Sequence, residues 1–202
     1  MIGLNIYALY SYAGDAQICF LLACMTVQLD FVKERLGDLN GNISSLDRRE
    51  LFMKHVRHIE ILKNFLRETE ETSSIPMFAL ICVVGLTMCA AAFRITKIGP
   101  NSEMTLFIMM IVYVLLMMLK IYLPCYYGTE IAHKSQQLTA VLYSLDWISY
   151  DKALRKDLTL MMTFTSSPMV LKAEGLFIYD LSMFTSAMNF AYSFYASLKG
   201  VF

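Results

Sequence analysis

Residues Thr72–Phe93 read TSSIPMFALICVVGLTMCAAAF, and this segment contains no charged side chain. A helix that crosses a bilayer needs about 20 mostly apolar residues, because every backbone amide must be bonded within the segment where water is absent. The segment meets both conditions, so it predicts a membrane-spanning helix. The chain is therefore expected to be a membrane protein.

The rest of the sequence contains three further candidate spans. Hydrophobic residues make up 57% of the chain, above the ~45–50% that is usual for soluble domains. Each further span carries one charge: Met1–Leu29 with Asp15, Met104–Thr129 with Lys120, and Gly175–Leu198 with Asp180. A charge inside a span usually faces protein or a water-filled space. The net charge is zero, so no overall field favours nucleic acid.

The distribution of Lys and Arg predicts the orientation of the spans. Residues 33–72 hold eight Lys or Arg and residues 126–174 hold five, whereas the short link 94–103 holds two. The positive-inside rule therefore puts both long loops in the cytoplasm, and the short link and both chain ends outside. Since the chain would then begin at the outer end of a span, we expect it to be a fragment that lacks earlier spans.

The cytoplasmic segments carry helical patterns. Apolar residues recur at helical spacings, mostly three or four positions apart, in three stretches, which predicts amphipathic helices. The residues are Phe52, Val56, Ile59, Leu62 and Leu66; Ile131, Leu138, Val141, Leu142 and Leu145; and Leu154, Leu158, Met161 and Met162. The predicted fold class is therefore all-α: a polytopic membrane helical bundle with long cytoplasmic helical extensions.

Signals for catalysis, metals and cofactors are weak. His55 and His58 are spaced to share a helix face, but no third ligand follows at a matching position, so no metal site is expected. Gly-rich phosphate loops and the GxSxG and HExxH motifs are absent from the sequence. The chain is predicted not to be an enzyme and to need no cofactor. A transporter, which would need buried ionisable groups or broken helices, is an alternative.

The last candidate span carries an unusual polar stripe. Ser182, Ser186, Asn189, Ser193 and Ser197 follow one another at steps of four, three, four and four. On a helix these positions share one face. Small polar residues allow close helix packing in membranes, but the same face could instead line water. Both interpretations remain open on the pattern alone.

Several stretches resemble insect odorant receptors. Tyr127-Gly128, with Leu142-Tyr143 and Trp147 downstream, is similar to the region after the sixth span of that family. The segments LKAEGLF (Leu171–Phe177) and AYSFYASL (Ala191–Leu198) resemble its seventh helix. The amphipathic helix with His55 and His58 resembles the loop between the fourth and fifth spans. The resemblance covers essentially the whole chain.

The resemblance implies the fourth to seventh spans of an odorant-gated, non-selective cation channel subunit. In the family's order, the predicted segments are 1–34 (span four), 35–71 (cytoplasmic helical loop), 72–95 (span five), 96–103 (extracellular link), 104–127 (span six), 128–173 (cytoplasmic helical anchor), 174–199 (span seven, the pore helix) and 200–202 (extracellular tail). It also implies a plasma-membrane protein that forms a hetero-tetramer with the odorant receptor co-receptor. The implied pore-lining residues are Ser186, Asn189, Ser193, Ser197 and Val201.

The ligand implied by the resemblance is a small volatile molecule bound in the transmembrane region. Candidate pocket residues come from the first and third spans of this chain: Tyr12, Ile18, Cys19, Phe107, Met110 and Tyr113. Aromatic and Met side chains of this kind suit an apolar small-molecule pocket. A gustatory-receptor-like channel is the related alternative, although the chain lacks the TYhhhhhQF ending that is usual for that family.

Overall fold

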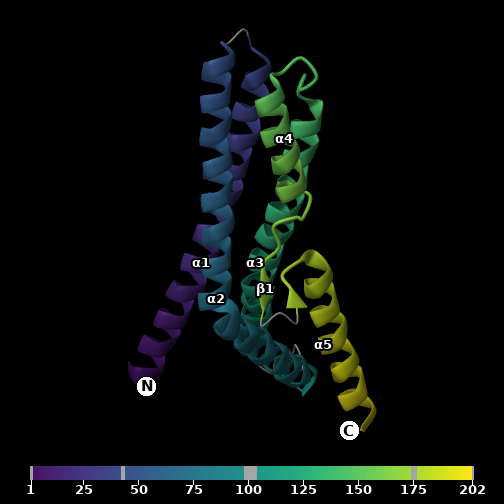
Figure 1. Cartoon of the computed structure of the whole chain (residues 1–202). Helices are drawn as coiled ribbons and strands as arrows, with labels where there is room; N and C mark the ends of the chain where they lie inside the picture. Colours follow the sequence, from purple (N-terminus) through teal and green to yellow (C-terminus); the bar gives the residue numbers. More distant parts are fainter. Residues whose placement is uncertain (1, 42–43, 98–103, 174–176, 202) are drawn as a thin grey trace. The chain divides into compact units, whose positions relative to one another are not determined.

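The computed structural model describes residues 2–41, 44–97, 104–173 and 177–201, and these are mostly helical (Figure 1). The elements in chain order are α1 (Ile2–Gly37), the short 3-10 helix η1 (Asp38–Asn40), α2 (Ser45–Lys97), α3 (Met104–Ser144), α4 (Lys152–Thr165), β1 (Lys172–Ala173), β2 (Phe177–Ile178) and α5 (Leu181–Val201). The predicted all-α fold class is confirmed.

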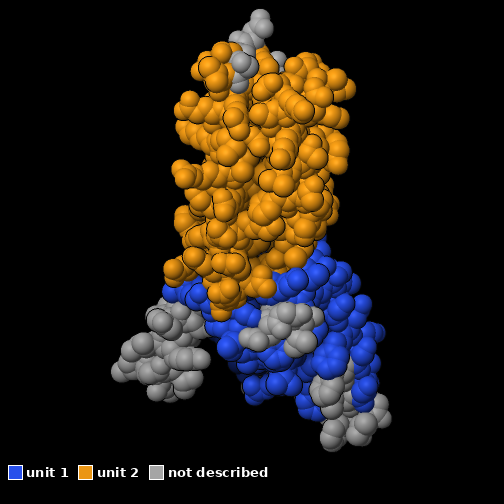
Figure 2. Space-filling model, viewed as in Figure 1, with its two compact units in different colours: residues 1–16, 72–126, 172–202 blue, residues 17–71, 127–171 orange. Residues whose placement is uncertain are grey.

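The chain divides into two compact units (Figure 2). Unit 1 comprises residues 1–16, 72–126 and 172–202, and unit 2 comprises residues 17–71 and 127–171. The first predicted span, 1–34, therefore crosses the division between the units at residues 16 and 17. Within the described residues, three helical stretches are long and apolar enough to cross a membrane: 12–37, 46–91 and 104–144.

Unit 2 is a helical bundle with a closed apolar core. Its core contains the positions that the amphipathic patterns predict to be apolar and buried. The buried members include Phe52, Ile59, Leu62, Leu66, Ile131, Leu138, Leu142, Leu145, Leu154, Leu158, Met161 and Met162, whereas Val56 and Val141 are half-buried. Leu29, Val32 and Leu36 of α1 complete the core at intervals of three and four. The helical patterns read from the sequence are thereby confirmed.

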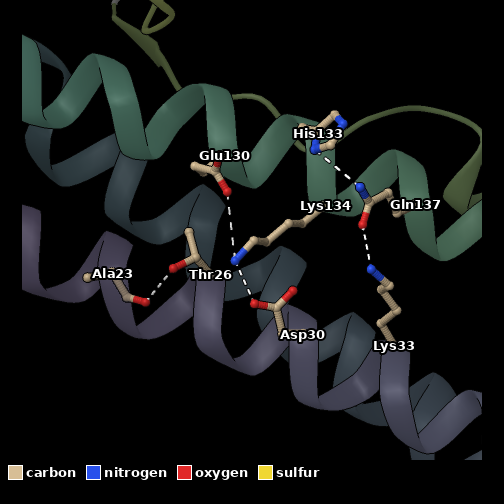
Figure 3. Close-up of polar contacts among 8 residues, drawn as sticks. All are labelled: Ala23, Thr26, Asp30, Lys33, Glu130, His133, Lys134 and Gln137. Atoms are coloured by element: carbon tan, nitrogen blue, oxygen red, sulfur yellow. Dashed lines mark hydrogen bonds and ion pairs between the residues drawn. The ribbon is translucent and has the colours of Figure 1, made fainter.

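Polar contacts join the helices of unit 2 around this core. Figure 3 shows two of them between α1 and α3: Lys134 Nζ lies 2.6 Å from Asp30 Oδ2, and Lys33 Nζ donates to Gln137 Oε1 at 2.6 Å. Between α2 and α4, Lys63 Nζ lies 4.0 Å from the centroid of the Phe164 ring. Exposed pairs contribute little to stability, typically below about 1 kcal/mol, so the apolar core carries most of the stability of unit 2.

The α2 helix continues without interruption from unit 2 into unit 1. The sequence predicts an amphipathic helix in one loop and a separate span after it, and the structure joins them into one helix from Ser45 to Lys97. Pro76 lies inside this helix. It has no N–H to donate, so the carbonyl of Thr72 loses its i→i+4 partner there. The α3 helix contains Pro124 and likewise continues from unit 1 into unit 2.

A short antiparallel strand pair precedes α5. Lys172 pairs with Ile178 and Ala173 pairs with Phe177. The sequence does not predict this pair, because two residues per strand are too few to show an alternating pattern. Within the predicted segment 174–199, β2 occupies Phe177–Ile178 and the helix α5 begins only at Leu181.

Candidate functional site

The start of α5 is set by the carboxylate of Asp180. Asp180 Oδ1 accepts a hydrogen bond from the backbone N–H of Met183 at 2.7 Å and from the hydroxyl of Ser182 at 2.8 Å. Such a side chain satisfies one of the backbone donors that the first turn of a helix leaves without a partner. The single charge of the last predicted span is therefore a helix cap.

One face of α5 packs against the rest of unit 1. Ala191 is buried, and Met183, Phe184, Ala187 and Met188 are half-buried. These residues follow at steps of one, three, one and three, so they form a single stripe on the helix.

Two contacts fix this packed face to other helices of unit 1. The ring of Phe184 meets Tyr122 of α3 edge-on with centroids 5.5 Å apart, and the Cys89 thiol of α2 lies 3.9 Å from the Ala191 carbonyl oxygen. A further ring contact, between Phe78 of α2 and Phe177 of β2 at 6.1 Å, holds the strand that leads into α5. The orientation of α5 about its own axis is therefore determined by packing within unit 1.

The polar stripe lies on the opposite face of α5. At 3.6 residues per turn, the stripe is turned by roughly 150° from the packed face. Its five members, Ser182, Ser186, Asn189, Ser193 and Ser197, are all exposed. The stripe is therefore not a packing seam against the described part of this chain. Val201 ends the same helix, and its side chain lies outside the described residues.

Hydrogen bonding differs among the members of the stripe. The hydroxyl of Ser186 donates to the carbonyl of Ser182 at 2.9 Å, and that of Ser197 donates to the carbonyl of Ser193 at 3.0 Å. Asn189 has no hydrogen bond to the described part of the chain. Its amide group has two N–H donors and one oxygen acceptor, which its own helix does not satisfy. Asn189 therefore needs water or a polar partner from outside the described chain.

The structure divides the six candidate pocket residues between the two units. Tyr12 of α1 and Phe107, Met110 and Tyr113 of α3 belong to unit 1, whereas Ile18 and Cys19 belong to unit 2. The three α3 residues lie on one face at intervals of three. Phe107, Met110, Ile18 and Cys19 are half-buried, and Tyr12 and Tyr113 are more exposed.

A charged cluster between α1 and α3 is the main feature of unit 1 that is not predicted from the sequence. Lys120 Nζ lies 2.8 Å from Asp15 Oδ2 and 4.5 Å from the centroid of the Tyr12 ring. The pair is an ion pair without a well-aligned hydrogen bond at Oδ2. Two lone charges of opposite sign in two spans were the signal that could have predicted it. Pairing lowers the cost of each charge in an apolar environment.

Among the described residues, no cluster of three or more His, Cys, Asp or Glu could hold a metal ion. His55 is buried in unit 2, and its pKa is lowered, first by burial and then by the nearby charges of His58, Lys54 and Arg35. His58 is half-buried beside it. The two histidines therefore lie together without a third ligand among the described residues.

Comparisons with known proteins identify the family. The family model described as 7tm Odorant receptor matches residues 1–192. Odorant receptor 94a of Drosophila melanogaster is 28% identical over 205 aligned positions, which cover 100% of this chain and 52% of the relative. Odorant receptor 10 of Aedes albopictus is 22% identical over 87% of this chain and 47% of the relative. The chain thus spans about half the length of the curated relatives it matches.

Solved structures share the fold. The insect olfactory receptor OR5 from Machilis hrabei matches with a TM-score of 0.78 at 19% identity, over 94% of this chain and 48% of that chain. The same receptor in complex with eugenol matches with a TM-score of 0.73 at 20% identity. The family model that matches is that of odorant receptors, the family that the sequence resembles. By the extent of the family match, the chain belongs to the 7tm odorant receptor family.

Proposed function

We propose that the chain works as part of a subunit of an odorant-gated, non-selective cation channel, and that the polar face of α5 lines the pore. The pore-lining residues would be Ser186, Asn189, Ser193, Ser197 and Val201. The rest of unit 1 would hold α5 in place, and unit 2 would form the cytoplasmic anchor. Family membership supports a receptor function, and the chemistry of α5 supports the pore.

The single observation that carries the pore proposal is the exposure of Asn189. Moving an unpaired amide from water to hydrocarbon costs about 4–8 kcal/mol. The face that carries Asn189 is turned away from the packed face of α5, so the chain itself does not satisfy this group. A water-filled pore would remove the cost, and it would also suit the exposed hydroxyl of Ser193, about one turn further along the stripe.

The proposed ligand is a small volatile organic molecule. The related receptor from Machilis hrabei was solved with eugenol, a small aromatic phenol. In unit 1, the candidate residues Tyr12, Phe107, Met110 and Tyr113 would contact the ligand, and the α3 members share one face of that helix. Ile18 and Cys19 of unit 2 remain candidates from the sequence. Aromatic and Met side chains suit such a ligand because they supply apolar, polarisable contact area.

The proposed partner is the odorant receptor co-receptor, in a hetero-tetramer at the plasma membrane. The proposed orientation has the C-terminus outside, as the excess of Lys and Arg in the two long loops indicates. In such an assembly the α5 helices of four subunits would surround one pore, and the exposed face of each would meet water.

Asn189→Asp tests this function directly. Recordings would use the receptor that contains this chain, co-expressed with a co-receptor, under calcium on one side and sodium on the other. A carboxylate in a pore attracts cations, so we expect the calcium-to-sodium permeability ratio to rise by about twofold or more. Thr163→Asp, which adds the same charge at an exposed position of α4, should leave the ratio unchanged.

Normal currents with an unchanged ratio in Asn189→Asp, and also in Ser193→Asp, would show that this face of α5 does not line the pore. Ser193→Asp is included because Asn189→Asp alone could lose its current for a reason specific to that position.

A further inference from the structure

A groove in unit 2 is lined mainly by basic side chains. It lies between the C-terminal part of α1 and the N-terminal part of α2 and has a volume of about 420 Å³. The basic lining residues are Arg35, Lys54, His55, Arg57 and His58. The described lining contains no Asp or Glu. The groove is therefore a site of concentrated positive charge.

The cations of this groove lack the partners that other cations of unit 2 have. Arg49 pairs with Asp157 at 3.2 Å, and Lys134 pairs with Asp30 at 2.6 Å. Among the described residues, Lys54 and Arg57 form no ion pair, and Arg35 contacts only the ring of Phe31 at 5.2 Å.

Acidic side chains on the same helix do not neutralise the groove. Asp47, Glu50 and Glu60 of α2 line a neighbouring hollow that Lys54 and Arg57 also line. None of these three carboxylates forms an ion pair with the groove cations in the described structure. Like charges held close together repel, and an anion in the groove would remove that repulsion.

The buried side chain of His55 lies beside the cations of the groove. The side chain lines the groove but is only 7% exposed, and its Nε2 has no hydrogen-bond partner. Its pKa is lowered, first by burial and then by His58, Lys54 and Arg35, while Asp38 acts weakly in the opposite direction. Three of these neighbours line the same groove, so the groove disfavours further positive charge.

We propose that this groove binds a multiply charged, phosphate-bearing anion. Arg guanidinium groups bind phosphate oxygens through two parallel hydrogen bonds, and a Lys ammonium adds a point charge. Arg35 reaches the groove from α1, and Lys54 and Arg57 reach it from α2, so the anion would join the two helices. Phe31, Leu51 and Ile61 line the same groove and offer an apolar surface to the remainder of the ligand. This proposal goes beyond the channel function and does not depend on it.

Binding is tested with the full chain in nanodiscs of neutral phosphatidylcholine, titrated calorimetrically with inositol hexakisphosphate. The groove variant combines Arg35→Gln, Lys54→Gln and Arg57→Gln. The control variant combines Arg67→Gln, Lys152→Gln and Lys156→Gln, which removes three exposed positive charges away from the groove. We expect the Kd to rise by about tenfold or more in the groove variant and by less than about twofold in the control, because charge-assisted hydrogen bonds are lost only in the former.

Folding is checked by the thermal midpoint without the anion. Removing like charges relieves repulsion, so the groove variant should unfold no earlier than the wild type. Equal weakening of both variants would show general charge attraction, and no binding to the wild type at physiological salt would also contradict the proposal. A change in oligomeric size with no effect on anion binding would make the groove a subunit contact instead, which also overturns it.

A second set of nanodiscs, which contain phosphatidylinositol bisphosphate, distinguishes a lipid headgroup from a soluble phosphate compound as the ligand. Competition between this lipid and inositol hexakisphosphate, lost in the groove variant, assigns the site to a lipid headgroup. Undiminished binding of the soluble anion in the presence of the lipid assigns it to a soluble phosphate compound. Both outcomes support an anion site in the groove.

Discussion

In unit 2 the apolar side chains of four helices turn towards one another, whereas in unit 1 those of α3 remain largely exposed. Leu138 and Leu142 of α3 lie in unit 2 and are fully buried, at 0% exposure. Met104 and Met109 of the same helix lie in unit 1 and keep 65% and 63% of their surface exposed. One helix therefore meets two different environments along its length.

The two units keep apolar surface away from water in different ways. Unit 2 removes apolar surface from water by packing it internally, as a soluble domain does. Unit 1 exposes apolar surface that lipid, or other parts of a receptor, must cover. Among its polar groups, Asp15 and Lys120 form an ion pair, Asp180 caps α5, and the stripe of α5 faces away from the packed face of that helix.

The largest loss of folding free energy is expected from truncating a buried side chain in the core of unit 2. Phe52→Ala removes a fully buried ring from α2 and should cost about 3–5 kcal/mol of folding free energy. Tyr192→Ala, on the exposed surface of α5 in unit 1, should change stability by less than about 0.5 kcal/mol. Thermal unfolding in detergent followed by circular dichroism measures both. Equal losses would mean that the units do not differ as described.

The charged pair of unit 1 gives the next effect. Lys120 is 12% and Asp15 28% exposed, so removing one partner leaves a charge in a largely apolar environment. We expect Asp15→Asn to cost about 2–3 kcal/mol, less than the ~3–5 kcal/mol of a fully buried pair. Adding Lys120→Met should restore most of that loss, which a double-mutant cycle of thermal midpoints measures. Additive losses would show that the two charges do not depend on each other.

The cap of α5 gives a smaller effect in unit 1. Asp180→Ala leaves the N–H of Met183 without its partner and should cost about 1 kcal/mol. Asp180→Asn keeps an oxygen acceptor at the same place and should lose much less. Amide hydrogen exchange of the first turn of α5 measures the difference. Equal exchange in the two variants would show that the carboxylate does not cap the helix.

The smallest effect is a dependence on pH in unit 2. The folded state holds the pKa of His55 below the unfolded value of 6.5, because of burial, His58 and Lys54 on the same helix, and Arg35 on α1, against Asp38 of η1. The unfolded state therefore binds the proton more readily, and unit 2 should lose stability as the pH falls below about 6.5.

His55→Gln removes the group that takes up the proton. The thermal midpoint of this variant should therefore change less between pH 7.5 and 5.5 than that of the wild type. His133→Gln, at an exposed position of α3, serves as the control and should keep the wild-type slope. If the thermal midpoint of His55→Gln depended on pH as strongly as that of the wild type, protonation of His55 would not be the cause of the loss.

The sequence predicted the features that depend on local periodicity. Positions such as Phe52, Leu138 and Leu158 recur at helical intervals, and helical geometry alone brings them to one face. The polar stripe of α5 was likewise visible as a pattern. Its direction relative to the packed face was not, because that depends on contacts such as Tyr122 with Phe184, which come from different helices.

Features that depend on pairing between distant segments could not be predicted. Asp15 and Lys120 are isolated charges in the sequence, and only the approach of α1 to α3 makes them partners. The anion groove also requires Arg35 of α1 to lie beside Lys54 and Arg57 of α2. The sequence supplied these residues, but their distances follow from packing.

Thiol labelling along α5 tests the proposal that its polar face lines a water-filled pore. Ser193→Cys, Ser197→Cys and Ala191→Cys would be made in a receptor whose exposed Cys24 and Cys82 are changed to Ser. A water-soluble thiol reagent added outside should modify the first two, faster when a ligand is present, and should leave the buried Ala191 position unmodified. Labelling of Ala191→Cys as fast as that of Ser193→Cys, or no labelling of either stripe position with ligand present, would contradict the claim.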